Sequence, residues 1–168
     1  MNPQDNILLM AKYNVWATHR LVASLDVVSD EHFYQDVALY FKSIFGTLNH
    51  MLLGEHYLWY SRFAGHDSPK VALDHIVHEH RKDLLNALES KSKNWIHFIN
   101  QLDVALLQGD LSYQRVSGQS ITLPYAATLI HVFNHSTHHR GQITAAMTAL
   151  GYICPELDLV YMLIEQNS

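Results

Sequence analysis

The sequence has only one cysteine, Cys154, among its 168 residues. A single cysteine cannot form an intramolecular disulfide, so disulfide-stapled folds are excluded. No apolar run approaches the roughly 18 residues that are needed to cross a bilayer. The N-terminal stretch MNPQDNILLMAKYNVWATHR also lacks the basic segment and the long apolar segment of a secretory signal peptide. We therefore predict a cytoplasmic protein with no membrane role.

Basic residues are also scarce. Lysine and arginine number 11 against 16 aspartates and glutamates, which gives a formal net charge of -5. A negative surplus repels a phosphate backbone, so nucleic-acid binding is disfavoured. The chain has no P-loop, no dinucleotide-binding glycine fingerprint and no Gly-x-Ser-x-Gly nucleophile elbow. No glutamate has a histidine three residues later, as a ferritin-like di-iron bundle requires.

The residues that are present favour one helical domain over residues 1–168. Hydrophobic residues make up 48% of the chain, enough for a single core. Apolar residues recur at spacings of three and four, which is typical of amphipathic helices. The expected helices cover residues 3–26, 43–63, 71–107 and 124–150, followed by a shorter one from Pro155 through Ile164. Alternation between 107 and 124 suggests a small hairpin. The predicted fold class is all-α, a four-helix bundle with a short fifth helix.

Histidine is unusually frequent, since its 13 copies outnumber the 11 lysines and arginines together. Four of them cluster in the last long helix, in the stretch HVFNHSTHHRGQ: His131, His135, His138 and His139. Residues four apart share a helix face and can bring two imidazoles to one metal ion. His131 pairs in this way with His135, and His135 with His139, while His138 borders the same face. Spacing alone leaves the choice open, although His135 belongs to every pairing.

A third ligand has to come from another helix, because a catalytic zinc-like site usually has three protein ligands and one open position. The helix over 43–63 offers His50 and His56. His50 has Gly46 one turn before it and Gly54 one turn after it, and these missing side chains leave room beside its imidazole. We therefore rank His50 above His56. The alternative is that the glycines only allow close helix packing and that the histidines belong to a metal-free bundle.

Four segments resemble the DinB family, also described as DinB/YfiT-like metal-binding four-helix bundles: HVFNHSTHHRGQI, LGYICPELDLVYML, LNHMLLGEHYLW and YNVWATHRL. The resemblance spans nearly the whole chain, and its most specific part is the run His135, His139, Arg140, Gly141 and Gln142. It implies a divalent metal ion, with zinc and nickel as the leading candidates, held by His50, His135 and His139. It also implies that the chain forms a homodimer. Characterised relatives in the family include thiol-dependent S-transferases.

Together these observations favour a metal-dependent enzyme that acts on a small-molecule substrate. The two reaction types that we expect are a thiol-dependent S-transferase with a low-molecular-weight thiol as cosubstrate, and a hydrolase that uses metal-bound water or thiolate. The alternative is a non-catalytic metal-binding or sensing bundle. The candidates to contact the ligands or to line the pocket are His131, His138, Gln142 and Tyr57. For Arg140 we expect a structural ion pair with Asp158.

Overall fold

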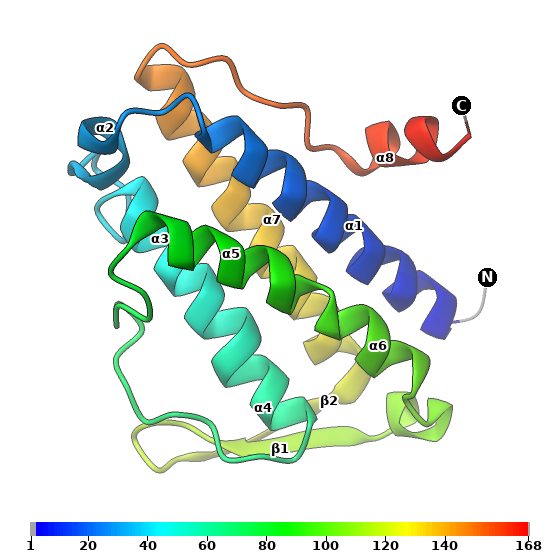
Figure 1. Cartoon of the computed structure of the whole chain (residues 1–168). Coiled ribbons are helices and arrows are strands. Elements are labelled where there is room, and N and C mark those ends of the chain that lie inside the picture. Colours follow the sequence, from blue (N-terminus) through cyan, green and yellow to red (C-terminus); the bar gives the residue numbers. More distant parts are fainter. Residues whose placement is uncertain (1–2, 168) are drawn as a thin grey trace.

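The computed structural model describes residues 3–167, and most of them are helical (Figure 1). The helices are α1 (Pro3–Leu25), α2 (Asp30–Tyr34), α3 (Ile44–Leu52), a π-helical segment (Leu53–Trp59), α4 (Tyr60–Phe63), α5 (Arg81–Ser92), α6 (Asn94–Asn100), a 3-10 helix (Val104–Gln108), α7 (Tyr125–Ala149) and α8 (Leu159–Gln166). The strands β1 (Asp110–Gln114) and β2 (Ser120–Pro124) form an antiparallel hairpin. The predictions of a helical fold and of a small hairpin before the last long helix are thus confirmed.

Local sequence explains where the long helices begin and end. The Ser43 hydroxyl caps α3 by accepting a hydrogen bond of 2.9 Å from the backbone N–H of Gly46. Pro124 directly precedes α7, where its fixed φ suits a helix start. At the other end of α7, Gly151 has a φ of 87°, which glycine adopts without strain. These start and stop residues are the ones that the sequence predicted.

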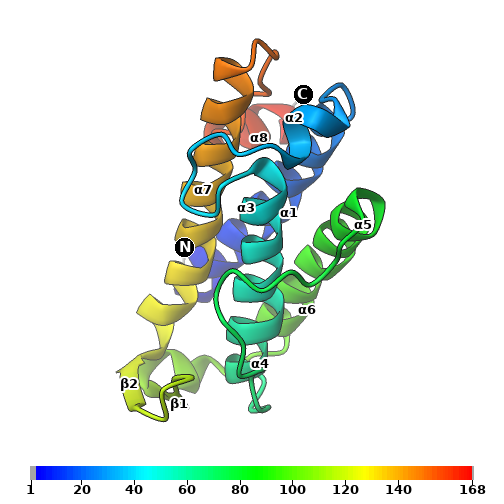
Figure 2. The same cartoon turned by 90° about the vertical axis from the view of Figure 1, so that its left-hand side faces the viewer.

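Besides a small apolar cluster of Tyr13, Ala17 and Met162 between α1 and α8, the helices pack around two larger apolar clusters. One lies among the C-terminal half of α1, α2, α3, α5 and the end of α7, and the other among the start of α1, α6 and the first half of α7. α1 packs against α5, α6 and α7, and α3 packs against α7. Figure 2 shows α3 and α7 running side by side, with the hairpin below them. A site shared by α3 and α7 is therefore carried by two well-packed helices. No described helix has the combination of length and apolar character that spanning a membrane requires.

The predicted helix over 71–107 is wrong at both ends. Residues 71–80 form an irregular loop, α5 begins only at Arg81, and the helical stretch ends at Asn100. Leu73, part of the apolar stripe that suggested a helix, is 54% exposed. The buried Asn49 side chain accepts hydrogen bonds from the backbone N–H groups of Val77 and His78 and donates to the His78 carbonyl. These contacts satisfy backbone groups that a helix would have used.

Two further helical segments differ from the prediction, one in where it begins and the other in its helix type. The last helix starts at Leu159 instead of Pro155, so residues 152–158 follow an extended path. The helical segment after Ser43 continues to Phe63 as predicted, but its middle is a π-helix, in which the Tyr60 N–H donates to the Glu55 carbonyl five residues earlier. π-helical turns occur frequently at functional sites. This one begins at Leu53, three residues after His50.

Candidate metal centre

Three histidines from two helices meet between α3 and α7. His50 lies on α3, and His135 and His139 lie one turn apart on α7. The Nε2 atom of His135 is 3.1 Å from the Nε2 atom of His50 and 3.1 Å from the Nε2 atom of His139. All three potential ligand atoms lie within 4.8 Å of one another, so the group could hold a metal ion. The structure thus brings together the three residues that the sequence singled out.

Hydrogen bonds on the far side of two rings fix how they face the centre. The Nδ1 of His50 is 2.8 Å from the carbonyl oxygen of Leu73, and the Nδ1 of His139 is 2.7 Å from Oε1 of Gln142. Since both oxygens only accept, each Nδ1 must carry the proton, and each Nε2 presents a lone pair. Metal-binding histidines commonly donate their second N–H to such oxygen partners. Gln142, a predicted pocket residue, therefore contacts His139.

The electrostatics keep the three imidazoles neutral at pH 7. Burial, together with smaller contributions from the neighbouring His139 and His50, lowers the pKa of His135 to about 3. Burial also lowers the pKa of His139 to about 4, although the hydrogen bond to Gln142 opposes this, and it lowers the pKa of His50. Neutral imidazole is the form that binds metals.

The donor set fits a metal ion better than it fits a metal-free core. With Nδ1–H on His50 and on His139, the lone pairs of their Nε2 atoms both point toward His135, whose ring can donate at most one proton between them. One of these two Nε2 atoms is therefore left without a protein donor among residues 3–167. Buried polar atoms without partners are rare and costly. A cation among the three Nε2 atoms would satisfy all the converging lone pairs at once.

The glycines beside His50 serve two different purposes. A Cβ at Gly46 would lie 2.1 Å from the carbonyl oxygen of Phe41, so this glycine lets the preceding chain approach. That approach stacks the Phe41 ring on His50, with centroids 3.8 Å apart and planes 16° apart. A Cβ at Gly54 would meet Cε1 of His135 at an ordinary 3.5 Å. The close-packing interpretation therefore holds at Gly46, whereas Gly54 faces the histidine group.

A cavity of about 530 Å³ opens beside two of the three histidines. One wall is formed by residues four apart along the helical segment 44–63: His50, Gly54, Leu58 and Arg62. Trp59, the α7 residues His131 and His135, and the hairpin residue Tyr113 complete most of the lining. The stripe can be recognised in the sequence, because Leu58 and Arg62 continue the four-residue spacing from His50 and Gly54. Arg62 was nevertheless not among the predicted pocket residues.

The remaining predicted pocket residues lie in different places. The exposed His131 lines the cavity, and its ring is 5.4 Å from the Trp59 ring. The exposed His138 contacts the edge of His139 from outside, with centroids 5.0 Å apart. Tyr57 is not brought to the cavity: it packs against the hydrophobic core, and the Lys91 ammonium lies 4.7 Å from its ring centroid.

The competing histidine, His56, points elsewhere. It is buried away from the three-histidine group, with Nε2 3.6 Å from Oε2 of Glu55. Burial and, to a smaller extent, Lys91 lower the pKa of His56 to about 3, so the imidazole is neutral and the contact with Glu55 is not an ion pair. The sequence ranking of His50 above His56 agrees with this geometry.

Arg140 has different partners from the one predicted. It is 1% exposed, donates hydrogen bonds to Asn14 and Thr137, and interacts electrostatically with the buried Glu55. Glu55 in turn accepts a hydrogen bond of 3.3 Å from Asn14. The expected ion pair with Asp158 is therefore wrong. A buried guanidinium needs a buried counter-charge, and Asp158 lies on the extended segment before α8.

Comparison with known proteins agrees with this architecture. The chain matches the DinB family over residues 1–167. It is also similar to Protein DinB of Bacillus subtilis (strain 168), with 29% identity over 160 residues, which cover 92% of this chain and 91% of that protein. With nearly its full length matched, and with the histidine group in place between α3 and α7, the chain belongs to the DinB family.

Proposed function

We propose that His50, His135 and His139 bind a divalent metal ion, with zinc and nickel as the leading candidates, inside a single-domain four-helix bundle of the DinB type. The observation that carries this proposal is the convergence of three Nε2 atoms, two of them oriented by hydrogen bonds on the opposite side of the ring. Three neutral nitrogen ligands with an open position suit Zn²⁺ and also Ni²⁺.

We further propose that the metal centre is catalytic, as a thiol-dependent S-transferase or as a hydrolase acting on a small molecule. A divalent ion at such a site lowers the pKa of a bound water or thiol and polarises an electrophile. The chain itself contributes fixed imidazole orientations, through Leu73 and Gln142, and a largely apolar wall beside them. The homodimer and the low-molecular-weight thiol are part of the same proposal, on the strength of family membership.

Metal content tests the first proposal. Protein purified without a nickel column should contain about one equivalent of divalent metal per chain, or take it up on dialysis against Zn²⁺ or Ni²⁺. His50→Ala should abolish uptake. His56→Ala is the matched control, because His56 lies on the same helical segment and is similarly buried but faces away. Equal metal content in the two variants, or no uptake by the unaltered protein, would contradict the proposed site.

Turnover tests the second proposal. The metal-loaded protein is assayed with a panel of low-molecular-weight thiols combined with electrophilic acceptors, and with a panel of esters. Activity should require both the metal and His135, and should disappear on chelation and return when the ion is restored. Stoichiometric metal without metal-dependent turnover on either panel would favour the non-catalytic binding or sensing role.

A further inference from the structure

Arg62 stands out in the cavity because it has no polar partner. It is half-buried on α4, at the end of the helical segment 44–63. Its guanidinium carbon lies 4.7 Å from the Trp59 ring centroid and 4.2 Å from the Tyr113 ring centroid. Within residues 3–167 its side chain makes no hydrogen bond and no ion pair, and its Nε atom is buried without a partner. The two rings hold the guanidinium in place but leave its N–H groups unused.

The other arginines show how unusual this is. Arg20 pairs with Glu165, Arg81 pairs with Asp30, and Arg140 interacts with Glu55. Only Arg62 and Arg115 lack a carboxylate partner in the described part of the chain. These two lie close enough for Arg115 to lower the pKa of Arg62, although burial lowers it more. An acidic chain thus keeps two uncompensated positive charges at one site.

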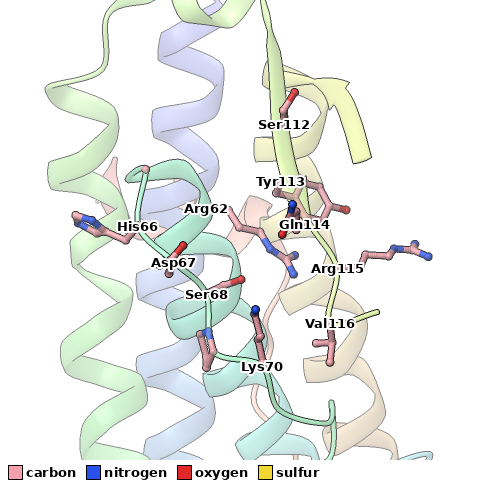
Figure 3. A pocket seen from close by; sticks show the side chains of 12 residues that line it. Arg62, His66, Asp67, Ser68, Lys70, Ser112, Tyr113, Gln114, Arg115 and Val116 are labelled. Carbon is pink, nitrogen blue, oxygen red and sulfur yellow. The ribbon is translucent and has the colours of Figure 1, made fainter. Parts of the chain in front are cut away.

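The positive charge is shared between two neighbouring cavities. Arg62, Tyr113 and Arg115 line both the cavity beside the histidines and a second one of about 390 Å³, which Lys70 also lines. Figure 3 shows Arg62 extending from α4 toward the hairpin, Lys70 reaching into the same space, and Arg115 extending outward. Asp67 lines the second cavity but makes no ion pair with these cations. Arg62 therefore lies where the two cavities adjoin, with Arg115 lining both of them and Lys70 lining the second.

From this arrangement we infer that the substrate of the proposed metal centre carries an anionic group, a carboxylate or a phosphate, that binds Arg62, and an apolar part that packs on Trp59 and Leu58. The inference rests on the proposed function only in placing the reacting end of the molecule at the histidines. A planar guanidinium presents paired N–H donors that match both kinds of oxyanion. Such an anion would supply the partner that Arg62 lacks, in a charge-assisted hydrogen bond that is stronger than a neutral one.

The test measures binding of three small aromatic probes at constant ionic strength: phenylacetate, benzyl phosphate and the neutral phenylacetamide. Dissociation constants are determined by calorimetry or ligand-observed NMR, once with chelator-treated protein and once with Zn²⁺-loaded protein. At least one anion should bind about tenfold more tightly than the amide in both preparations. The tighter of the two anions identifies the group.

Three variants locate the effect. Arg62→Gln should remove the preference for the anion, and Arg62→Lys should retain part of it, because it keeps the charge but not the paired donors. Arg20→Gln is the matched control, since Arg20 also lies over a tryptophan, 5.0 Å from the Trp16 ring centroid, but on another face and paired with Glu165. It should leave the preference unchanged.

Four results would overturn the inference. These are equal affinity for anion and amide, no measurable binding of any probe, a preference that survives Arg62→Gln, and a preference seen only with Zn²⁺ present, which would place the anion on the ion. Because the decisive arm uses metal-free protein, failure of the metal proposal leaves this test intact. A missing anion preference likewise leaves the metal content of the protein unaffected.

Discussion

His50 donates a hydrogen bond of 2.8 Å from Nδ1 to the carbonyl oxygen of Leu73, which lies on the loop for which the sequence predicts a helix. The neighbouring residue, Asn49, holds the same loop at Val77 and His78. Two consecutive residues of α3 therefore fix the loop at two points, and the loop in turn orients one proposed ligand.

Replacing Asn49 with alanine should weaken metal binding although Asn49 is not itself a ligand. The change frees the loop, so the Leu73 carbonyl no longer holds the His50 ring, and loss of such a supporting contact typically costs roughly ten- to a hundredfold in metal affinity. Competition with a zinc chelator measures it. Asn134→Ala, an exposed asparagine on α7, is the control. Unchanged zinc affinity in Asn49→Ala would show that the loop plays no part in orienting His50.

Gln142 should increase the affinity for zinc by orienting the His139 ring. Gln142→Leu removes the acceptor 2.7 Å from Nδ1 of His139, so the ring loses its preferred tautomer and orientation, and zinc affinity should fall by roughly ten- to a hundredfold. Gln142→Glu offers a carboxylate acceptor instead and should bind zinc at least as tightly as the unaltered protein. The same chelator competition applies. A loss of similar size in both variants would contradict the hydrogen-bond explanation.

Replacing Gly46 with alanine should lower the stability of the fold, whereas replacing Gly54 with alanine should not. Gly46→Ala places a Cβ 2.1 Å from the Phe41 carbonyl, so the chain must shift, and unfolding free energy should fall by about 1–3 kcal/mol. At Gly54 the nearest atom is 3.5 Å away, and alanine favours helix over glycine by roughly 0.5–1 kcal/mol, so stability should be unchanged or higher. Urea denaturation of the metal-free variants measures both. A stable Gly46→Ala protein would refute the close-approach argument.

The metal-free protein should lose stability as the pH falls below neutrality. Burial lowers the folded-state pKa of His135 to about 3 and that of His139 to about 4, from an ordinary value of 6.5. The unfolded chain therefore binds more protons between these limits, so this contribution is complete above pH 6.5 and declines as the pH drops toward 4 and 3. Thermal denaturation across this range should show a shallower decline for His135→Gln. The exposed His75→Gln should follow the unaltered protein.

The group of three converging histidines could be predicted because local geometry limited the candidates and the family resemblance selected among them. The spacing of His135 and His139 places them on one helix face in any α-helix, and the glycines around His50 distinguish it from His56. Sequence spacing did not reveal the contacts made across the fold. The apolar stripe of residues 71–80 fits a helix. The side chain of Asn49, about thirty residues earlier, instead makes hydrogen bonds with the backbone of Val77 and His78.

Arg140 illustrates the same limit. Its electrostatic partner depends on which charge is buried beside it. Glu55 comes from the π-helical segment and Asn14 from α1, and neither spacing nor composition connects them to Arg140. Arg62 was missed for a related reason, since an arginine without a counter-charge can be recognised only when its neighbours are known.

The separation of the three histidines along the chain has one more consequence. His50 and His135 are 85 residues apart, so an ion bound between them would join the two halves of the chain as a cross-link does. Cross-links over long loops restrict the unfolded chain most. Such an ion would have all three nitrogens only after α3 and α7 had packed together. Once bound, it would slow their separation, so that chelation should shorten the lifetime of the folded state as well as empty the site.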